Sequence, residues 1–301
     1  MKLVIQIPCF NEEGSLPEAL AALPNRIQGI RELKVLVIDD GSQDRTAEVA
    51  RAGGAVVHAF PEHRGLAAGF SAGLKQALAM GADIVVNTDA DNQYEAADIP
   101  ALIEPIVSGK ADMVIGDRDV STEEYFSPAK RVLQQIGSGV VSLAAGVRVP
   151  DATSGFRAFS RAAAARVIVR SRFSYTLETL IQAGALKQRI AFVPVRTNAP
   201  VRPSRLMRSQ MQYVRRSAAI ILKTVAMYRP VMALVSFSAF CATIAAAGWL
   251  AASPPALIAG AVLEAAALVG FVPLYLKNRA VLRRVAEQAS VAERAAVAVV
   301  A

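Results

Sequence analysis

The first 116 residues repeat one pattern, in which a short run rich in valine and isoleucine is followed by a longer segment with apolar residues at helical spacing. The short runs are apolar throughout, which is typical of parallel strands that helices cover on both faces. Glycine follows three of the helical segments, as expected at helix ends. The pattern therefore predicts an open α/β sheet. The predicted strands are 3–7, 34–39, 55–59, 83–87 and 112–115, and the predicted helices are 14–23, 44–52, 66–80 and 94–108.

The pattern changes after about residue 128, where longer helical segments and a polar loop take over. We expect this half to complete the sheet and to form the acceptor side of a cleft. Helices are predicted at 129–145, 162–169 and 176–187, with a loop at 149–155 and a strand at 190–195.

Composition excludes several classes of protein. With 53% hydrophobic residues and a mean hydropathy of +0.36, the chain is neither disordered nor an acidic solvating tail. Cys9 and Cys241 lie far apart in the sequence, which excludes a disulfide scaffold and a cysteine-rich zinc site and favours a reducing cytosol. The net charge of +8 is concentrated beside apolar runs and has few aromatic neighbours, so a membrane is favoured as partner over nucleic acid.

Two long apolar runs follow Pro230. Residues 231–252 contain no charge, residues 256–276 contain only Glu264, and Ser253-Pro254-Pro255 separates them. Each run of about 21 residues is long enough to cross a hydrocarbon core of about 30 Å. Basic residues flank the pair while the turn has none, which predicts a transmembrane hairpin with both ends in the cytoplasm. A buried hairpin in a larger soluble core is the alternative.

These signals divide the chain into a cytosolic catalytic domain, an interfacial helix and an integral membrane part. The interfacial helix has Arg215, Arg216 and Lys223 among apolar residues, which suits an anionic membrane surface, with an ordinary solvated helix as the alternative. Glu264 is costly in lipid, and we expect it at a contact between copies of the chain, that is, a homo-oligomer. The predicted segments are 1–210 (catalytic), 211–229 (interfacial), 230–277 (membrane hairpin) and 278–301 (cytosolic tail).

Polar and acidic clusters follow three of the predicted strands. They are 8–13, 39–42 and 88–93, and the carboxyl ends of parallel strands form the edge where open α/β sheets bind ligands. In the third cluster Asp89 and Asp91 are two residues apart, so on extended backbone their carboxylates project to the same side. Mg²⁺ or Mn²⁺ suits such a pair, because these ions complete their shells with water and substrate phosphates. The sequence therefore predicts a metal and diphosphate site.

Taken together in order, Pro8-x-x-Asn11-Glu12, Asp39-Asp40-Gly41-Ser42 and Asp89-Ala90-Asp91-x-Gln93 resemble the family 2 glycosyltransferases. The resemblance covers about residues 2–210 and is greatest to the membrane-bound polyprenyl-phosphate sugar transferases, the group that includes dolichol-phosphate mannose synthase. It implies a GT-A fold, which is a Rossmann-like, mostly parallel sheet with flanking helices. Further matches are Arg64–Gly69 before a helix, the acceptor-side loop Asp151–Arg157, and Glu178.

The resemblance also implies roles for individual residues. Those expected to bind the nucleotide are Pro8, Asn11, Glu12, Asp39, Asp40 and Gly65, although Asp40 could equally cap a turn or helix. Those expected to hold the metal on the diphosphate are Asp89, Asp91 and Gln93, with Arg118 and Arg131 completing the catalytic set. Those expected at the acceptor phosphate are Arg131, Ser154, Arg157, Arg202 and Arg205, because arginine forks bind phosphate oxygens.

The predicted reaction moves a sugar from a UDP- or GDP-sugar to a polyprenyl phosphate by in-line displacement with inversion. A phosphate monoester is already anionic at neutral pH, so the reaction needs no strong base. A processive polysaccharide synthase is disfavoured, because the only tryptophan is Trp249 and the Gln-x-x-Arg-Trp signature is missing. A dinucleotide oxidoreductase would need Gly-x-Gly-x-x-Gly where residues 8–12 stand. A catalytically silent membrane partner remains as the third alternative.

Overall fold

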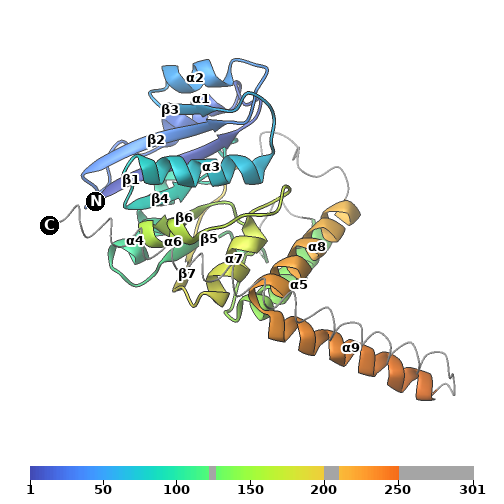
Figure 1. The fold of residues 1–301 in the computed structure, drawn as a ribbon. Helices are drawn as coiled ribbons and strands as arrows, with labels where there is room; N and C mark the ends of the chain where they lie inside the picture. The colour runs from blue at the N-terminus through green and yellow to red at the C-terminus, as the bar shows by residue number, and fades with distance from the viewer. Residues whose placement is uncertain (122–126, 200–209, 251–301) are drawn as a thin grey trace.

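The strands form one seven-stranded sheet in the order β3-β2-β1-β4-β6-β5-β7 (Figure 1). The structure is a computed structural model that describes residues 1–121, 127–199 and 210–250. All strand pairs are parallel except those of β6, which is antiparallel to both β4 and β5. The strands are β1 (Lys2–Cys9), β2 (Glu32–Asp39), β3 (Val56–Ala59), β4 (Ile84–Asn87), β5 (Met113–Asp117), β6 (Arg157–Ser160) and β7 (Ile190–Pro194).

Helices cover both faces of the sheet, and two hydrophobic cores result. Alternate residues of β1 point to opposite faces, so that Leu3 and Ile5 pack with α1, α2 and α4, while Val4 packs with α3, α6 and α7. The predicted α/β architecture is therefore confirmed. The helices are α1 (Leu16–Ala22), α2 (Thr46–Ala52), α3 (Leu66–Ala79), η1 (Ala96–Asp98), α4 (Ile99–Val107), α5 (Pro128–Ala145), α6 (Arg161–Arg166), α7 (Thr176–Ala185), α8 (Gln210–Tyr228) and α9 (Pro230–Leu250).

Strand β6 is the one strand of the described sheet that the sequence did not predict. It has four residues, Arg157–Ser160, and it follows directly on the polar loop at 149–155. A run this short carries too little periodicity to be recognised by pattern. Its position in the sheet is important for the site, because β6 lies between β4 and β5 and brings the loop at 149–155 beside the ends of both strands.

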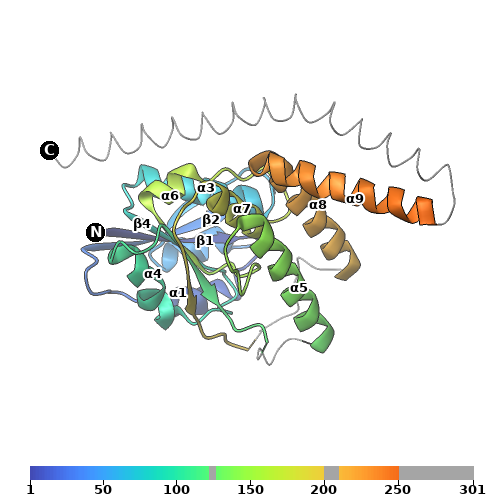
Figure 2. The same cartoon turned by 90° about the horizontal axis from the view of Figure 1, so that it is seen from below.

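Helices α5, α7 and α8 pack together, and α9 projects away from the rest of the described chain in both ribbon views (Figures 1 and 2). At the junction of α8 and α9, the Arg229 guanidinium donates to the carbonyl oxygen of Ala145, the last residue of α5. A cation is favourable at a helix C-terminus, because carbonyl groups there lack intrahelical partners. The start of α9 is thus attached to α5, the helix that precedes the loop at 149–155.

The transmembrane hairpin predicted from the sequence finds no support in the part of the chain that the structure describes. No single helix there is both long and apolar enough to cross a membrane. The pair formed by α8 and α9 meets the length and composition criteria together, but the two segments are bent by 120° at their junction. The predicted second span at 256–276, with Glu264, lies outside the described residues, as does the predicted tail at 278–301.

Candidate active site

Asp89 lies just beyond the carboxyl end of β4 and faces Gly155 of the neighbouring loop. A Cβ atom added to Gly155 would lie 3.2 Å from Asp89 Oδ2 and 3.1 Å from the Tyr175 hydroxyl. The Gly155 N–H donates to the Tyr94 hydroxyl over 2.8 Å, which fixes the loop at this distance. A side chain here would require the hydroxyl or the carboxylate to move by a few tenths of an ångström, so the loop packs directly against the carboxylate.

The Asp89 carboxylate is in an environment that disfavours its negative charge. Loss of solvent and the nearby charges of Asp91 and Glu12 raise the pKa of Asp89 to about 7, against the opposing effect of Arg118. A carboxylate pair that lacks compensating charge fits a bound cation. Among the described residues no group of three or more histidine, cysteine, aspartate or glutamate side chains is placed to hold a metal. A two-carboxylate site suits Mg²⁺ or Mn²⁺, which take their other ligands from water and phosphates.

A tight turn over Asp91, Asn92 and Gln93 shapes the other half of the carboxylate pair. Asn92 has a φ of 55°, in the left-handed region, and the Gln93 N–H donates to Asp91 Oδ1 over 3.2 Å. Asn198, which follows β7, binds this turn through both its backbone and its side chain, with the Asn198 N–H donating to the Gln93 carbonyl over 2.8 Å and its Nδ2 to the Asn92 carbonyl over 2.9 Å. The expected ligands Asp89, Asp91 and Gln93 therefore lie in one loop, which is held by its own turn and by Asn198.

Arg118, which follows β5, connects this loop with the loop at 149–155. Its Nε and Nη2 donate to the two carboxylate oxygens of Asp151 over 2.6 and 3.0 Å, and Nη2 also donates to Thr153 Oγ1 over 2.7 Å. Burial opposes ionisation of Asp151, but Arg118 and Thr153 together lower its pKa. Burial alone would lower the pKa of Arg118, but its neighbours Tyr94, Asp151 and Asp89 raise it, so the guanidinium stays protonated. The expected catalytic residue Arg118 thus lies among the carboxylates of both loops.

Arg157 requires a correction. It was expected at the acceptor phosphate, but its side chain is fully buried at the start of β6. The guanidinium donates to the carbonyl oxygens of Ser154, Thr176 and Ala152 and to the Thr179 hydroxyl. Burial lowers the pKa of Arg157 to about 10, since desolvation disfavours the cation. A guanidinium enclosed in this way braces the loop from inside and presents no face to a lipid phosphate.

The other residues expected at the acceptor phosphate differ in position. Ser154 is fully buried, and its hydroxyl has no hydrogen-bond partner among the described residues. Arg131 lies in the first turn of α5, where its N–H donates to the Ser127 carbonyl over 3.0 Å. Arg202 and Arg205 lie outside the described residues.

The residues expected to bind the nucleotide line the carboxyl ends of β1 and β2. The Asn11 N–H donates to the Ser42 hydroxyl over 2.9 Å, and the Glu12 N–H donates to the Thr46 hydroxyl over 2.8 Å. Buried Asp39 accepts the Ser42 N–H over 3.0 Å. Pro8, in β1, pairs in register with Ile38 of β2. These contacts tie the two strand ends together beside the loop of Asp89 and Asp91.

Asp40 proves to anchor the segment that enters α3. Its two carboxylate oxygens accept the N–H groups of Arg64 and Gly65 over 2.7 and 2.8 Å, and His63 Nδ1 lies 3.0 Å from Oδ2. Gly65 has a φ of 94°, a conformation that glycine adopts without strain. With both oxygens engaged and the side chain buried, Asp40 acts on the loop around Gly65, and the expected direct contact with a nucleotide is not supported by its position.

Comparison with known proteins identifies the family. The model described as Glycosyl transferase family 2 matches residues 4–168, which is more than half of the chain. The chain belongs to glycosyl transferase family 2. The family expected from the sequence motifs is confirmed, and the protein is a family 2 glycosyltransferase.

Two similar relatives are named as lipid-phosphate sugar transferases. An undecaprenyl-phosphate mannosyltransferase of Micrococcus luteus is 30% identical over 208 residues, which cover 65% of this chain and 83% of that protein. A UDP-N-acetylglucosamine–dolichyl-phosphate N-acetylglucosaminyltransferase of Methanococcus voltae is 28% identical over 213 residues, which cover 64% and 83% of the two chains. Both relatives are thus matched over most of their length.

A solved structure shows the same fold. Glucosyl-3-phosphoglycerate synthase from Mycobacterium tuberculosis, in complex with Mn²⁺, UDP and glucosyl-3-phosphoglycerate, matches with a TM-score of 0.57 and 20% identity, over 75% of this chain and 79% of that one. The likeness at this identity establishes the fold alone. The family 2 chain described here therefore has a GT-A-like α/β fold with a mostly parallel, mixed sheet.

Several site residues of this glycosyltransferase were not singled out from the sequence. Asn87, in β4, donates from its Nδ2 to the Gly155 carbonyl and to the Tyr175 hydroxyl over 2.9 Å each, and it accepts from Gln6 Nε2 over 2.9 Å. The signal available in the sequence was that Gln6 and Asn87 are amides in otherwise apolar strands, and a buried amide needs hydrogen-bond partners. Tyr94 joins the site through Gly155. Asp151 belongs to the acceptor-side loop that the motifs did indicate, but its pairing with Arg118 is seen only in the folded chain.

Proposed function

We propose that this glycosyltransferase moves a sugar from a nucleotide-sugar donor to the phosphate of a polyprenyl phosphate, with inversion at the anomeric carbon. The observation that carries the proposal is the position of Arg118. Its guanidinium is held by Asp151 and Thr153 of the acceptor-side loop, and its charge acts on Asp89 of the donor side. A fixed cation between two sites that each take a phosphate suits this reaction. The names of the two relatives support the acceptor class.

Asp89 and Asp91 would hold the metal ion, and the raised pKa of Asp89 is the observation that favours a cation there. A bound Mg²⁺ or Mn²⁺ supplies Lewis-acid stabilisation of the charge that develops on the departing diphosphate. The presence of Mn²⁺ with UDP in the solved structure of similar fold supports this assignment. Gln93 and Asn198 fix the turn, so the two carboxylates are positioned before any ligand arrives.

The chain's own residues position the reactants, and no strong base is required of them. A phosphate monoester has a second pKa near 6, so the acceptor is an anionic nucleophile at neutral pH. The chain contains two histidines, and one of them, His63, is engaged with Asp40 on the nucleotide side. Arg118 would hold the acceptor-side loop through Asp151 and Thr153 and add positive charge near the attacking phosphate, while Gly155 allows the loop to approach Asp89 closely. Orientation and charge then supply the catalysis.

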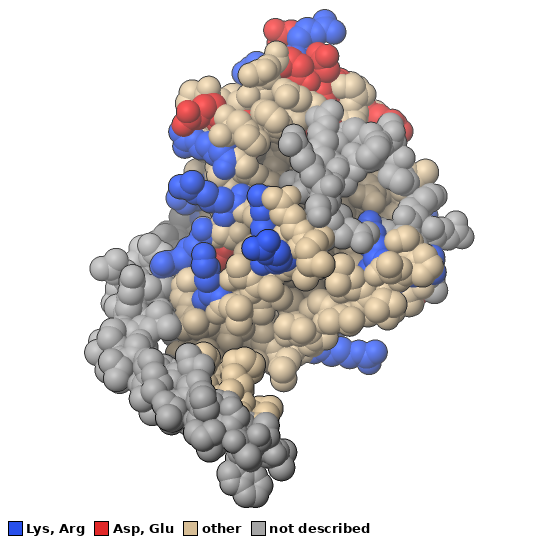
Figure 3. Space-filling view, turned by 90° about the vertical axis from the view of Figure 1, so that its right-hand side faces the viewer, with Lys and Arg blue, Asp and Glu red and all other residues tan. Residues whose placement is uncertain are grey.

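The surface of the described chain supports work at a membrane. Helix α5 exposes a row of apolar side chains at helical spacing, namely Val132, Ile136, Val140 and Leu143. Helix α8 adds exposed Arg215, Arg216 and Lys223. On the face drawn in Figure 3, lysine and arginine gather across the middle, whereas aspartate and glutamate gather toward the top. We place the catalytic domain on the cytoplasmic face of a membrane, where anionic lipids attract such basic segments.

The direct test incubates the purified full chain with radiolabelled UDP- and GDP-sugars, Mn²⁺ or Mg²⁺, and undecaprenyl phosphate in detergent. The proposal predicts label in the organic phase as a species labile to mild acid, formed only with a divalent cation. A parallel tube contains 3-phosphoglycerate in place of the lipid. Transfer to that soluble acceptor and not to the lipid contradicts the proposal.

A second outcome separates an enzyme from a catalytically silent partner. An active site predicts slow, metal-dependent hydrolysis of the donor even without an acceptor, and this activity should be lost in Asp91→Asn. If neither hydrolysis nor transfer occurs with any donor, while the chain remains folded by circular dichroism, the silent-partner alternative replaces the proposal.

A further inference from the structure

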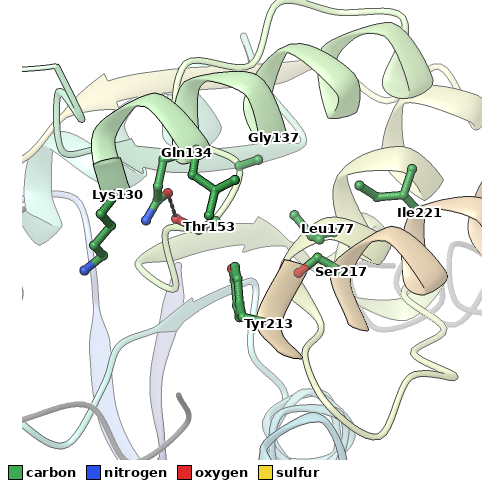
Figure 4. A pocket seen from close by; sticks show the side chains of 10 residues that line it. Lys130, Gln134, Gly137, Thr153, Leu177, Tyr213, Ser217 and Ile221 are labelled. Carbon is green, nitrogen blue, oxygen red and sulfur yellow. Dashed lines mark hydrogen bonds between the residues drawn. The ribbon is translucent and has the colours of Figure 1, made fainter. Parts of the chain in front are cut away.

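An apolar groove runs from the acceptor-side loop between helices α5, α7 and α8. Its volume is about 600 Å³, which includes the part open to solvent. Leu133 of α5, Leu177 of α7 and Ile221 of α8 line it, and Figure 4 shows Leu177 and Ile221. A hydrocarbon chain in such a groove would replace water against these side chains, which is favourable by about 25 cal/mol per Å² of apolar surface.

The basic side chain among the residues that line this groove, Lys130, lies at one end, and Tyr213 and Ser217 contribute hydroxyl groups further along. Thr153 lies at that end, and its hydroxyl accepts from Arg118 Nη2 over 2.7 Å and lies 2.6 Å from Gln134 Oε1. Lys130 lines the same end, as seen at the left of Figure 4. Thr153 therefore places this end of the groove next to Arg118, the arginine that joins the donor and acceptor sides of the active site. This continuity relates the groove to the reaction.

The charge pattern of the groove selects the kind of ligand. Lys130 lies at one end and mainly apolar side chains line the rest, which matches an amphiphile with an anionic head and a hydrocarbon chain. The wall formed by α5 continues outward to the exposed row that includes Val132 and Ile136, 56% and 60% exposed, so a chain can leave the groove along an apolar surface. A soluble phosphate ester would use the head end alone.

We propose that this groove holds the isoprene units nearest to the phosphate of the lipid acceptor, and that it selects acceptors by their chain. The inference rests on the proposed function, because it places the tail of the same substrate. Lys130 receives the phosphate at the end of the groove next to Arg118, and Leu133, Leu177 and Ile221 contact the first isoprene units. Acceptor affinity then grows with chain length until the groove is filled, and further units contribute little.

Two glycines of α5 provide a matched pair of variants. A Cβ atom added to Gly137 or to Gly139 meets no atom within 4 Å, and a larger side chain raises helix propensity at both positions. Gly137 lines the groove, whereas Gly139 is exposed and does not line it. Gly137→Phe fills the groove, and Gly139→Phe adds the same side chain two residues away.

The experiment measures equilibrium binding of radiolabelled farnesyl phosphate to the full chain in detergent, together with KM for geranyl and undecaprenyl phosphates. We expect Gly137→Phe to weaken farnesyl phosphate binding at least tenfold and to raise KM for undecaprenyl phosphate similarly, with KM for the donor unchanged. Gly139→Phe should match the unsubstituted chain in all of these. A smaller effect on geranyl phosphate than on undecaprenyl phosphate is expected in Gly137→Phe.

Each contrary outcome overturns the inference in a recognisable way. Equal farnesyl phosphate binding by the Gly137→Phe and Gly139→Phe variants shows that the chain lies elsewhere. No binding by the unsubstituted chain shows that another part of the protein fills the groove. Both results leave the proposed function intact if label still transfers to undecaprenyl phosphate. The proposed function itself fails only if no label is transferred to undecaprenyl phosphate. The binding measurement does not depend on that transfer.

Discussion

Arg118 and Asp151 form a buried, bidentate ion pair, with distances of 2.6 Å from Nε to Oδ2 and 3.0 Å from Nη2 to Oδ1. The arginine follows β5, and the aspartate stands 33 residues later in the loop before β6. Both side chains are almost inaccessible, at 7% and 0% exposure. The pair therefore sets the distance between the end of β5 and the acceptor-side loop, and through Thr153 it defines one end of the groove.

Arg118→Lys should keep the positive charge and lose the bidentate hydrogen bonding to Asp151. Removing one partner of a buried pair costs about 3–5 kcal/mol because it leaves an uncompensated charge, whereas lysine retains part of the interaction. We expect a clear fall in melting temperature and a reduction of about 100-fold in kcat/KM for the acceptor, or about 2.7 kcal/mol. Asp151→Asn should give a similar loss, and the double variant should be far from additive. Independent, additive losses would show that the two residues do not act as a unit.

Gly155→Ala tests the close approach of the loop to Asp89. The added Cβ would lie 3.1 Å from the Tyr175 hydroxyl and 3.2 Å from Asp89 Oδ2, so one of these groups must move. We expect the apparent affinity for Mn²⁺, measured from the metal dependence of donor hydrolysis, to fall about tenfold, or about 1.4 kcal/mol. Gly139→Ala, where the added atom has no neighbour within 4 Å, serves as control. An unchanged metal affinity in Gly155→Ala would separate the loop from the metal site.

Arg157→Met distinguishes a structural role from phosphate binding. The residue is fully buried and donates to four protein acceptors, so its loss leaves several carbonyl oxygens without partners. We expect the free energy of unfolding to drop by about 3 kcal/mol or more. Activity per folded molecule should retain the acceptor KM of the unsubstituted chain at low temperature. A specific rise in acceptor KM with stability unchanged would restore Arg157 to the acceptor site.

The burial of Arg157 depends on tertiary packing, which the sequence pattern does not reveal. The carboxyl ends of predicted strands located Asp89 and Asp91, because strand direction and sheet edge follow from local pattern and crossover rules. Arg157 stands in a polar loop sequence, which indicates a surface, and only the packing of α7 against the short strand β6 encloses it. The Arg118–Asp151 pair likewise depends on tertiary contacts between segments far apart. Local pattern therefore predicted the metal side of the site better than its acceptor side.

The ion pair of Asp98 and Arg196 should govern part of the stability in acid. Burial raises the pKa of Asp98, but hydrogen bonds and charge from Arg196 outweigh it, so the folded-state pKa lies below the usual value. The pair therefore stabilises the fold above the unfolded pKa of about 3.9, and the contribution is lost as the pH falls through the lower folded value. At pH 7 we expect Asp98→Asn to cost about 1 kcal/mol in urea unfolding, with the difference shrinking as the pH falls below the unfolded value.

A control for this prediction is the exposed pair of Lys110 and Glu104, whose side chains are 74% and 58% exposed and 3.8 Å apart. Such surface pairs contribute about 0–1 kcal/mol, so Glu104→Gln should change stability little at any pH. A difference between the Asp98→Asn variant and the unsubstituted chain that stays constant from pH 7 to pH 3 would contradict the role assigned to the Asp98 carboxylate.

The central claim is that Asp89 and Asp91 hold one divalent cation against the diphosphate of the donor. Titration calorimetry of UDP and GDP into the full chain, with Mn²⁺ and then with excess chelator, tests it most directly. The account predicts that one of the nucleotides binds with Mn²⁺, that chelator weakens this binding at least tenfold, and that the Asp89→Asn, Asp91→Asn double variant is insensitive to Mn²⁺. Nucleotide binding that is equally tight with chelator and in the double variant would contradict the account.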